Sequence, residues 1–298
     1  MAAMHEGQVH IDADIAREII SDQFPEYRFE PIIPVASIGT DNAIFRVGSG
    51  VCARFPLHPM EAPICAEKLH REAASMKELA DHCALATPRP IAIGRPGPLF
   101  AMPYSLQSWI EGDVATHDSH AASDTFALGL AELIASMRAV ETRDRRFDRP
   151  GRGGHLPDHD AWMSTCFANS RGLLDVERLR DLWLRLRELP RSRADLMNHG
   201  DLVPANLLVG GEQLIGVLDC GGFGPADPAL DLVAGWHLLD RNRREILRVR
   251  LGADEIEWQR GAAWAFQQAM GLVWYYHSSN PSMSALGRST LTRILEDA

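Results

Sequence analysis

Apolar residues recur along the chain with two different periods, and the change between them falls near Glu111. Before it, short runs rich in β-branched and aromatic residues alternate with turn residues, which predicts strands. We expect these strands over 29–35, 43–47, 50–55, 91–93, 99–102 and 105–110. Helical spacing predicts helices over 12–24 and 62–82. The first of them follows capping acids and ends at Pro25. The N-terminal pattern therefore predicts an antiparallel sheet with a packed helix.

Helical spacing takes over after residue 115. We expect helices over 122–140, 160–170, 175–189, 229–251, 254–276 and 281–294. One β-rich hairpin interrupts them, with strands over 206–209 and 213–218 joined by Gly210-Gly211. The whole pattern predicts an α+β fold of two lobes, residues 1–110 and 111–298, the larger lobe being mainly helical and carrying the hairpin.

The polar residues around this hairpin are difficult to explain as core. Asp201 precedes the first strand, Asn206 begins it, and Asp219 follows the second. Side chains at strand ends can converge on one point. Mg²⁺ prefers oxygen ligands and is usually held by one or two carboxylates plus substrate phosphates, so Asn206 and Asp219 are candidate ligands. Asp201 then remains as a candidate general base for a hydroxyl.

The spacing from His199 to Asp219 follows the protein-kinase patterns H-R-D-L-x-x-x-N and D-F-G, with Gly200 in place of the Arg and Cys220 in place of the Phe. Together with the DPALDL segment over 227–232, this stretch closely resembles the aminoglycoside phosphotransferase family, antibiotic kinases whose fold is similar to that of protein kinases. A chance acidic turn before a buried hairpin would explain any one match. Three matches in order and spacing disfavour that alternative.

The resemblance implies ATP or GTP as co-substrate, with Mg²⁺. Arg54 stands where the kinase strand motif places a phosphate-binding Lys, and it keeps the charge with a different geometry. Glu72 matches the family acid that pairs with that cation. Main-chain groups of Trp109, Ile110 and Glu111 correspond to the linker that binds the base edge in the family.

Two further assignments follow from the resemblance. Ser37 and Thr40 lie where kinases carry a glycine-rich phosphate loop; only one glycine is present, and a plain hairpin turn explains the segment equally well. Asp227 and Asp231 match family acids that brace the active-site loops. Acidic residues of the C-terminal helices are conceivable contacts for an acceptor, among them Asp240, Glu255 and Glu257.

The amino-acid composition limits the classes of molecule that we expect this protein to bind. The chain has 298 residues, 46% of them apolar, and a formal net charge of -10, which argues against nucleic acid or an anionic membrane as partner. The charge suits a cationic small-molecule substrate, although many soluble proteins are acidic without such a purpose. The five cysteines contain no C-x-x-C pair. Acidic residues near the start of the sequence, before any apolar run, do not fit the pattern of a signal peptide. The apolar run 261–276 is too short for a membrane span. We therefore expect a cytoplasmic protein.

The leading hypothesis is a small-molecule kinase that transfers the γ-phosphate of ATP or GTP to a hydroxyl of an aminoglycoside-like or related antibiotic. A metabolite kinase of the same fold, acting on choline, homoserine or a sugar, is the alternative within the enzyme class. The reduced glycine loop and Arg54 also motivate a non-catalytic nucleotide-binding protein. The sequence leaves the acceptor, the preferred nucleotide and the oligomeric state open.

Overall fold

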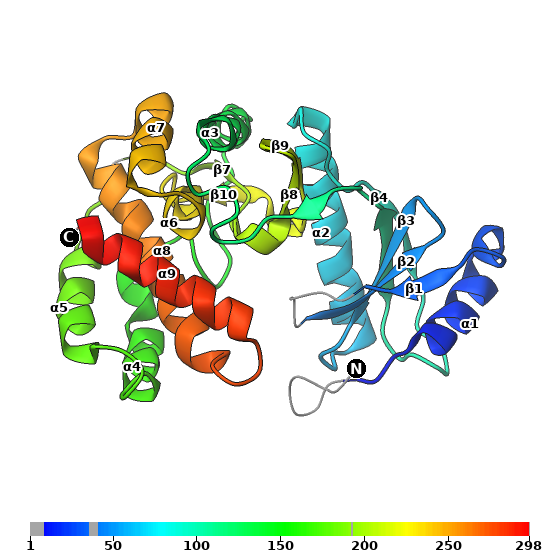
Figure 1. Cartoon of the computed structure of the whole chain (residues 1–298). Helices are drawn as coiled ribbons and strands as arrows, with labels where there is room; N and C mark the ends of the chain where they lie inside the picture. Colours follow the sequence, from blue (N-terminus) through cyan, green and yellow to red (C-terminus); the bar gives the residue numbers. More distant parts are fainter. Residues whose placement is uncertain (1–8, 36–40, 192, 298) are drawn as a thin grey trace. The chain divides into compact units, whose positions relative to one another are not determined.

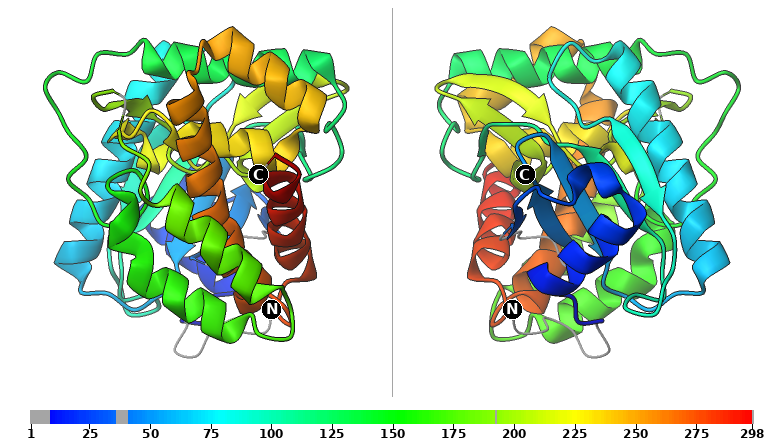
Figure 2. Two further views of the ribbon diagram at one scale, coloured as in Figure 1. Left: turned by 90° about the vertical axis from the view of Figure 1, so that its left-hand side faces the viewer. Right: turned by 90° about the vertical axis from the view of Figure 1, so that its right-hand side faces the viewer.

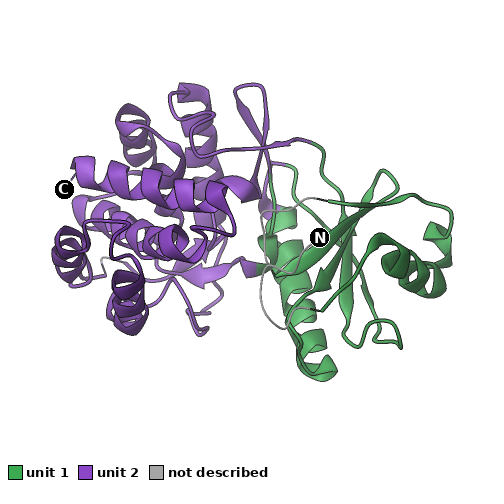
Figure 3. Ribbon diagram, turned by 60° about the horizontal axis from the view of Figure 1, so that its bottom comes forward, with its two compact units in different colours: residues 1–81, 86–111, 217–221 green, residues 82–85, 112–216, 222–298 purple. Residues whose placement is uncertain are grey.

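The computed structural model describes residues 9–35, 41–191 and 193–297. They group into two compact units (Figure 3). The first unit comprises residues 1–81, 86–111 and 217–221, and the second comprises 82–85, 112–216 and 222–298. The division into lobes 1–110 and 111–298 stays a prediction, and the short segment 217–221, which carries Asp219, is grouped with the first unit.

The first unit is built on a five-stranded antiparallel sheet in the order β1-β2-β3-β5-β4. Its strands are β1 (Ile32–Pro34), β2 (Asn42–Val47), β3 (Val51–Pro56), β4 (Pro90–Gly94) and β5 (Tyr104–Ser108). Along β2 buried and half-buried residues alternate, as expected for a strand with two different faces. The predicted antiparallel sheet is therefore confirmed.

Two helices accompany this sheet, α1 (Ala13–Gln23) and α2 (Ala62–His82), and Figure 1 shows them on opposite sides of it. The side chain of Asp12 caps α1 by accepting hydrogen bonds from the backbone N–H groups of Asp14 and Ile15, at 3.0 and 2.9 Å. In the core below α1, the rings of Phe55 and Tyr104 stack with centroids 4.4 Å apart.

The second unit is mainly helical, as predicted. Its α-helices are α3 (Asp124–Arg138), α4 (Asp160–Asn169), α5 (Val176–Leu186), α6 (Val233–Leu238), α7 (Arg241–Leu251), α8 (Glu255–Tyr275) and α9 (Pro281–Asp297). Its strands are β6 (Asp113–Val114), β7 (Leu196–Asn198), β8 (Leu207–Gly210), β9 (Gln213–Val217) and β10 (Gly224–Ala226). β8 and β9 form the predicted hairpin, and β7 pairs with β10. The helices α8 and α9 pack side by side (Figure 2).

Several predicted elements are wrong. Residues 99–102 form no strand; Phe100 makes only an isolated bridge with Gly97. The single helix expected over 229–251 is broken, because Leu239 is extended and Asp240 caps a new helix by accepting from the N–H of Arg243. The pattern also missed β7 and β10, whose three residues each are too few for a visible period. None of the helices in the described part of the chain is long and apolar enough for a membrane span.

Candidate active site

The loop that follows β7 is organised by backbone geometry. Gly200 adopts a φ of +86°, a left-handed conformation in which a side chain would be strained. A Cβ at this position would also lie 3.1 Å from the guanidinium of Arg149. This explains physically why Gly200 replaces the Arg of the kinase pattern. The turn sends the chain from the buried His199 to Asp201, whose side chain is 43% exposed.

Asp231 holds this turn in place. Its carboxylate accepts the backbone N–H of His199 at 2.7 Å on Oδ2 and that of Gly200 at 2.9 Å on Oδ1. Burial raises the pKa of Asp231, and the two N–H donors act in the opposite direction. Asp227 is buried as well and accepts from Arg260 and Trp264 of α8. Asp231 therefore contacts the loop backbone in the way that the resemblance implied, whereas these side-chain contacts of Asp227 are with α8.

The carboxylate of Asp201 is fixed on both oxygens. Its Oδ1 accepts from Arg152 Nη2 at 2.7 Å and from Gln268 Nε2 at 3.0 Å. Asn206 donates from Nδ2 to the Asp201 main-chain oxygen at 2.9 Å and to Oδ2 at 3.2 Å. Because the amide nitrogen of Asn206 donates in this way, its Oδ1 is the atom that can accept a hydrogen bond or bind a cation. Sequence reasoning missed Arg152 and Gln268.

In the first unit, Arg54 of β3 pairs with Asp219. Arg54 Nη1 lies 2.9 Å from Asp219 Oδ1, and the Arg54 side chain is only 16% exposed. Burial lowers the pKa of Arg54, but the Asp219 carboxylate outweighs it, so the net direction is upward. Asp219 has a φ of +55°, a left-handed conformation that is uncommon for any residue other than Gly, although Asn and Asp adopt it more readily than most. Strained backbone of this kind persists where the surroundings impose it, and it often marks functional sites.

Glu72 of α2 is an electrostatic neighbour of Arg54, but its ion pair at 3.7 Å is with Lys68. Burial raises the pKa of Glu72. Gly221 approaches the same helix so closely that a Cβ there would lie 3.0 Å from the Glu72 Cβ. The predicted pairing of Arg54 with Glu72 therefore stays a prediction, and the carboxylate at hydrogen-bonding distance from Arg54 is that of Asp219.

The segment after β5 carries the predicted base-edge contacts. The N–H of Trp109 donates to the main-chain oxygen of Gly50 at 2.8 Å, so this group is already used. The guanidinium of Arg46 lies 4.8 Å from the centroid of the Trp109 ring and forms an ion pair with Glu111. Ile110, between Trp109 and Glu111 in the sequence, is half-buried.

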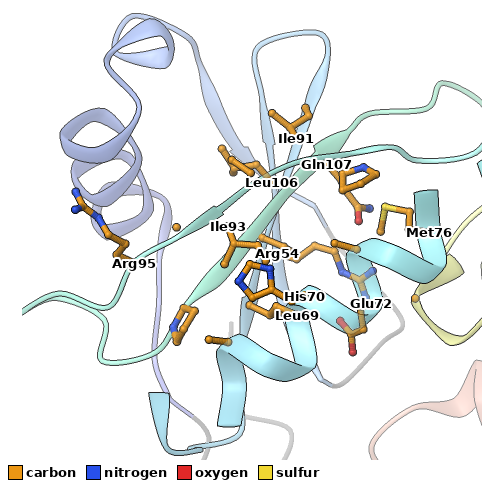
Figure 4. Close-up of a pocket in the computed structure, with 18 of the residues that line it drawn as sticks. Arg54, Leu69, His70, Glu72, Met76, Ile91, Ile93, Arg95, Leu106 and Gln107 are labelled. Carbon is orange, nitrogen blue, oxygen red and sulfur yellow. The ribbon is translucent and has the colours of Figure 1, made fainter. Parts of the chain in front are cut away.

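A cavity of about 540 Å³ opens between α2 and the strands β4 and β5 (Figure 4). Arg54 and Glu72 line it together with apolar side chains such as Leu69 and Ile93. Gln107 also lines it and is 6% exposed, and in the described residues its Oε1 has no hydrogen-bond partner. The volume falls within the range of small-molecule pockets.

The structure thus brings Asp201 together with Asn206, and Arg54 together with Asp219. Asp201 and Asn206 belong to one unit and Asp219 to the other, so their convergence on one metal ion stays a prediction. Ser37 and Thr40 lie outside the described residues. No cluster of three or more His, Cys, Asp or Glu suited to a metal occurs in the parts that the structure describes. The donor set of one carboxylate and one amide oxygen fits Mg²⁺, which takes most of its ligands from phosphates and water.

The protein has the features of a kinase-like phosphotransferase. In the first unit α2 accompanies an antiparallel sheet, and Asp219 of the D-x-G segment contacts Arg54 of β3. The second unit is mainly helical. The chain belongs to the phosphotransferase enzyme family, whose sequence model matches residues 33–264. No relative was found among proteins with curated descriptions. The predicted family, fold class and enzyme class are therefore confirmed.

Solved structures with the same fold are distant in sequence. Aminoglycoside 2'-phosphotransferase-IIIa in its GDP complex has a TM-score of 0.71 and 18% identity, covering 97% of this chain and 100% of that one. A related GDP and kanamycin complex also has a TM-score of 0.71 and 18% identity, covering 95% and 98%. Macrolide 2'-phosphotransferase MphH from Brachybacterium faecium has a TM-score of 0.61 and 16% identity, covering 94% and 97%.

Proposed function

We propose that this phosphotransferase transfers the γ-phosphate of ATP or GTP to a hydroxyl group of an aminoglycoside-like or related antibiotic. The observation that carries the proposal is Asp201, a half-exposed carboxylate on a turn that Gly200 permits and that two hydrogen bonds to Asp231 hold in place. A general base needs this combination of access and fixed position. The nucleotide complexes and antibiotic enzymes among the structural neighbours support the same reaction class.

In the proposed reaction the acceptor oxygen forms a bond to the γ-phosphorus while the bond from that phosphorus to the bridging oxygen breaks. The electron pair of the broken bond leaves on the nucleoside diphosphate, and the hydroxyl proton goes to Asp201. Catalysis of this kind depends mainly on positioning and charge neutralisation. Arg54 would bind phosphate oxygens, with Glu72 as a nearby counter-charge, and main-chain groups at Ile110 and Glu111 would bind the base edge. Ser37 and Thr40 would donate hydrogen bonds to the nucleotide phosphates.

Mg²⁺, when bound, would neutralise the phosphate charge. Asn206 Oδ1 and the Asp219 carboxylate would hold it. The Asp219 carboxylate already contacts Arg54, so it can fix the cation of the protein and the cation of the nucleotide with one side chain. This double role gives a reason for the unfavourable backbone conformation of Asp219.

The acceptor class is proposed as an antibiotic because antibiotic 2'-phosphotransferases are among the structural neighbours, and the net charge of -10 is compatible with a cationic one. Within the C-terminal helices, Glu257 is unsuitable as a direct contact, because it is buried against Arg138 at 2.8 Å. Glu255 is exposed and pairs with Arg248 at 2.7 Å, and Asp240 caps α7. A metabolite kinase of the same fold is the alternative that the experiment must separate.

The test is phosphate transfer from ATP and from GTP with Mg²⁺ over aminoglycosides, macrolides, choline, homoserine and simple sugars. Transfer to one antibiotic class supports the proposal and identifies the acceptor. Transfer to a metabolite alone would replace the antibiotic by that metabolite. Nucleotide binding without transfer to any acceptor would contradict the enzymatic proposal.

A further inference from the structure

Gln268 donates a hydrogen bond to Asp201, and no sequence motif predicts this contact. It lies in α8, is 9% exposed, and donates from Nε2 to Asp201 Oδ1 at 3.0 Å. An amide can present either its oxygen or its nitrogen, and only the nitrogen suits a carboxylate. The position of Asp201 therefore depends on what fixes the orientation of the Gln268 amide.

A buried histidine fixes it. His237 of α6 is fully buried, and its Nε2 lies 3.0 Å from Gln268 Oε1. Its Nδ1 lies 2.8 Å from the hydroxyl oxygen of Thr290 on α9, which is also fully buried. Burial lowers the pKa of His237 to about 4, so the imidazole is neutral near pH 7, with one donating and one accepting nitrogen.

Only one arrangement of hydrogens satisfies all three contacts. The carboxylate can only accept, so Gln268 must donate to it and offer its oxygen to His237. His237 must then donate from Nε2, and Thr290 must donate to Nδ1. The opposite tautomer of His237 would turn the amide oxygen of Gln268 towards the carboxylate, which would place two acceptors together. The hydrogen bonds therefore run in one direction from α9 to Asp201.

We propose that Thr290, His237 and Gln268 form a positioning relay that fixes the Asp201 carboxylate for proton transfer. This assignment rests on the proposed function, in which Asp201 is the general base. Gln268 and Arg152 occupy Oδ1, whereas Asn206 donates to Oδ2 at a longer 3.2 Å. Oδ2 is then the oxygen that retains a lone pair for the hydroxyl proton of the acceptor. Side chains from the three helices α6, α8 and α9 thereby determine the orientation of one side chain on the loop after β7.

The first variant is Gln268→Met, which keeps the length of the side chain and removes the amide. The matched control is Gln267→Met, because Gln267 is its neighbour in α8, is similarly buried, and contacts His159 at 3.2 Å instead of Asp201. We expect Gln268→Met to lower kcat roughly 10- to 100-fold with little change in the KM for nucleotide, since misplacement of reacting groups acts mainly on turnover. Gln267→Met should stay within about 2-fold of the wild type.

A pair of substitutions at His237 tests the direction of the relay. The amide nitrogen of Gln in His237→Gln can take the place of the Nε2 donor, whereas His237→Asn offers a polar group only near the Nδ1 position. We expect His237→Gln to retain most of the turnover and His237→Asn to lose about as much as Gln268→Met. Equal turnover of these two variants, with similar melting temperatures, would contradict the relay.

A measurement on the wild-type protein does not depend on variants that fold. Long-range ¹H–¹⁵N NMR of the histidine rings should show His237 as the neutral Nε2–H tautomer at pH 7. The Nδ1–H tautomer or a charged ring would overturn the relay. Asp201→Asn separates this failure from that of the proposed function. Loss of transfer in Asp201→Asn alongside normal turnover of Gln268→Met would reject only the relay, whereas normal transfer in Asp201→Asn would reject the base itself.

Discussion

At the scale of single residues, the site depends on backbone conformations that few residue types adopt. Gly200 and Asp219 both have a positive φ, and each is next to or part of the predicted catalytic set. The kinase pattern in the sequence located both positions. It could not reveal that Arg54 contacts Asp219 at 2.9 Å, because a contact between residues 165 positions apart depends on the fold.

Replacement of Gly200 by Ala should therefore affect activity more than stability. The left-handed conformation costs an L-residue about 1–2 kcal/mol. Gly211→Ala is the matched control, because Gly211 has a φ of +60° in open space within the hairpin turn. We expect both variants to lose a similar free energy of unfolding in urea. Only Gly200→Ala should lower kcat, by about 10-fold or more, because it shifts Asp201. Equal kcat values would show that the turn does not position the base.

Because Gln107 Oε1 is a buried acceptor without a hydrogen-bond partner in the described residues, we expect that an apolar residue at this position stabilises the protein. A buried acceptor without a partner costs about 1–3 kcal/mol, and an apolar group of similar shape avoids that cost. We expect Gln107→Leu to raise the free energy of unfolding by about 1 kcal/mol, measured by urea denaturation. A clear loss of stability would mean that Gln107 Oε1 has a partner such as an ordered water molecule.

Because the pKa of His237 is lowered in the folded protein, we expect the free energy of unfolding to depend on pH. Burial is the main cause that lowers its pKa to about 4. The hydrogen bond with Gln268 and the charge of Asp201 oppose this shift, whereas the charges of Arg152 and Arg293 add to it. In the unfolded chain the pKa is near 6.5, so between pH 6.5 and 4 the unfolded state binds a proton that the folded state does not. This contribution is fully present above pH 6.5 and is lost as the pH falls towards 4, by about 3 kcal/mol in total.

The comparison variant for this pH dependence is His237→Gln, which has no titrating group. Denaturation midpoints of both proteins from pH 7.5 to 4.5 provide the measurement. The wild type should lose more stability across this window than the variant. Parallel curves would show that His237 titrates normally in the fold.

At the scale of elements, pattern and length decided what could be predicted. Residues 62–82 were predicted as a helix and form α2 with the same bounds, because 21 residues show several periods of apolar spacing. The strands β7 and β10 have three residues each and show none. The relay was also beyond prediction, although the buried pair Gln267-Gln268 inside an apolar helix was a visible signal.

Asp231 lies just before α6 and holds the loop after β7 by hydrogen bonds to His199 and Gly200. Its substitution tests whether these bonds position the loop. Asp231→Asn leaves one of the two acceptor oxygens and places an amide donor against a backbone N–H. We expect a loss of about 1–3 kcal/mol in the free energy of unfolding, because one buried N–H loses its partner, together with a fall in kcat. Asp254→Asn is the control, since Asp254 only caps α8 and Asn is an equally good cap. Unchanged kcat in Asp231→Asn would exclude a bracing role.

At the scale of the whole molecule, the family defines the reaction class, and the residues of the proposed site fall into two sets. One unit contains Arg54, Glu72 and Asp219, and the other contains Asp201 and Asn206. Both sets were predicted from the sequence because kinase chemistry imposes their order and spacing. The acceptor was not predictable, because helices of the second unit present charged side chains whose partners depend on packing, as the burial of Glu257 illustrates.

The central claim is that Asp201 accepts the proton of the acceptor hydroxyl. The most direct measurement is the rate of phosphate transfer to the acceptor identified in the panel, compared between the wild type, Asp201→Asn and the control Asp181→Asn, an exposed residue on α5. We predict a loss of about 10²- to 10⁴-fold in kcat for Asp201→Asn. Nucleotide binding should be retained, and Asp181→Asn should behave as the wild type. Turnover in Asp201→Asn equal to that of the wild type would contradict the account.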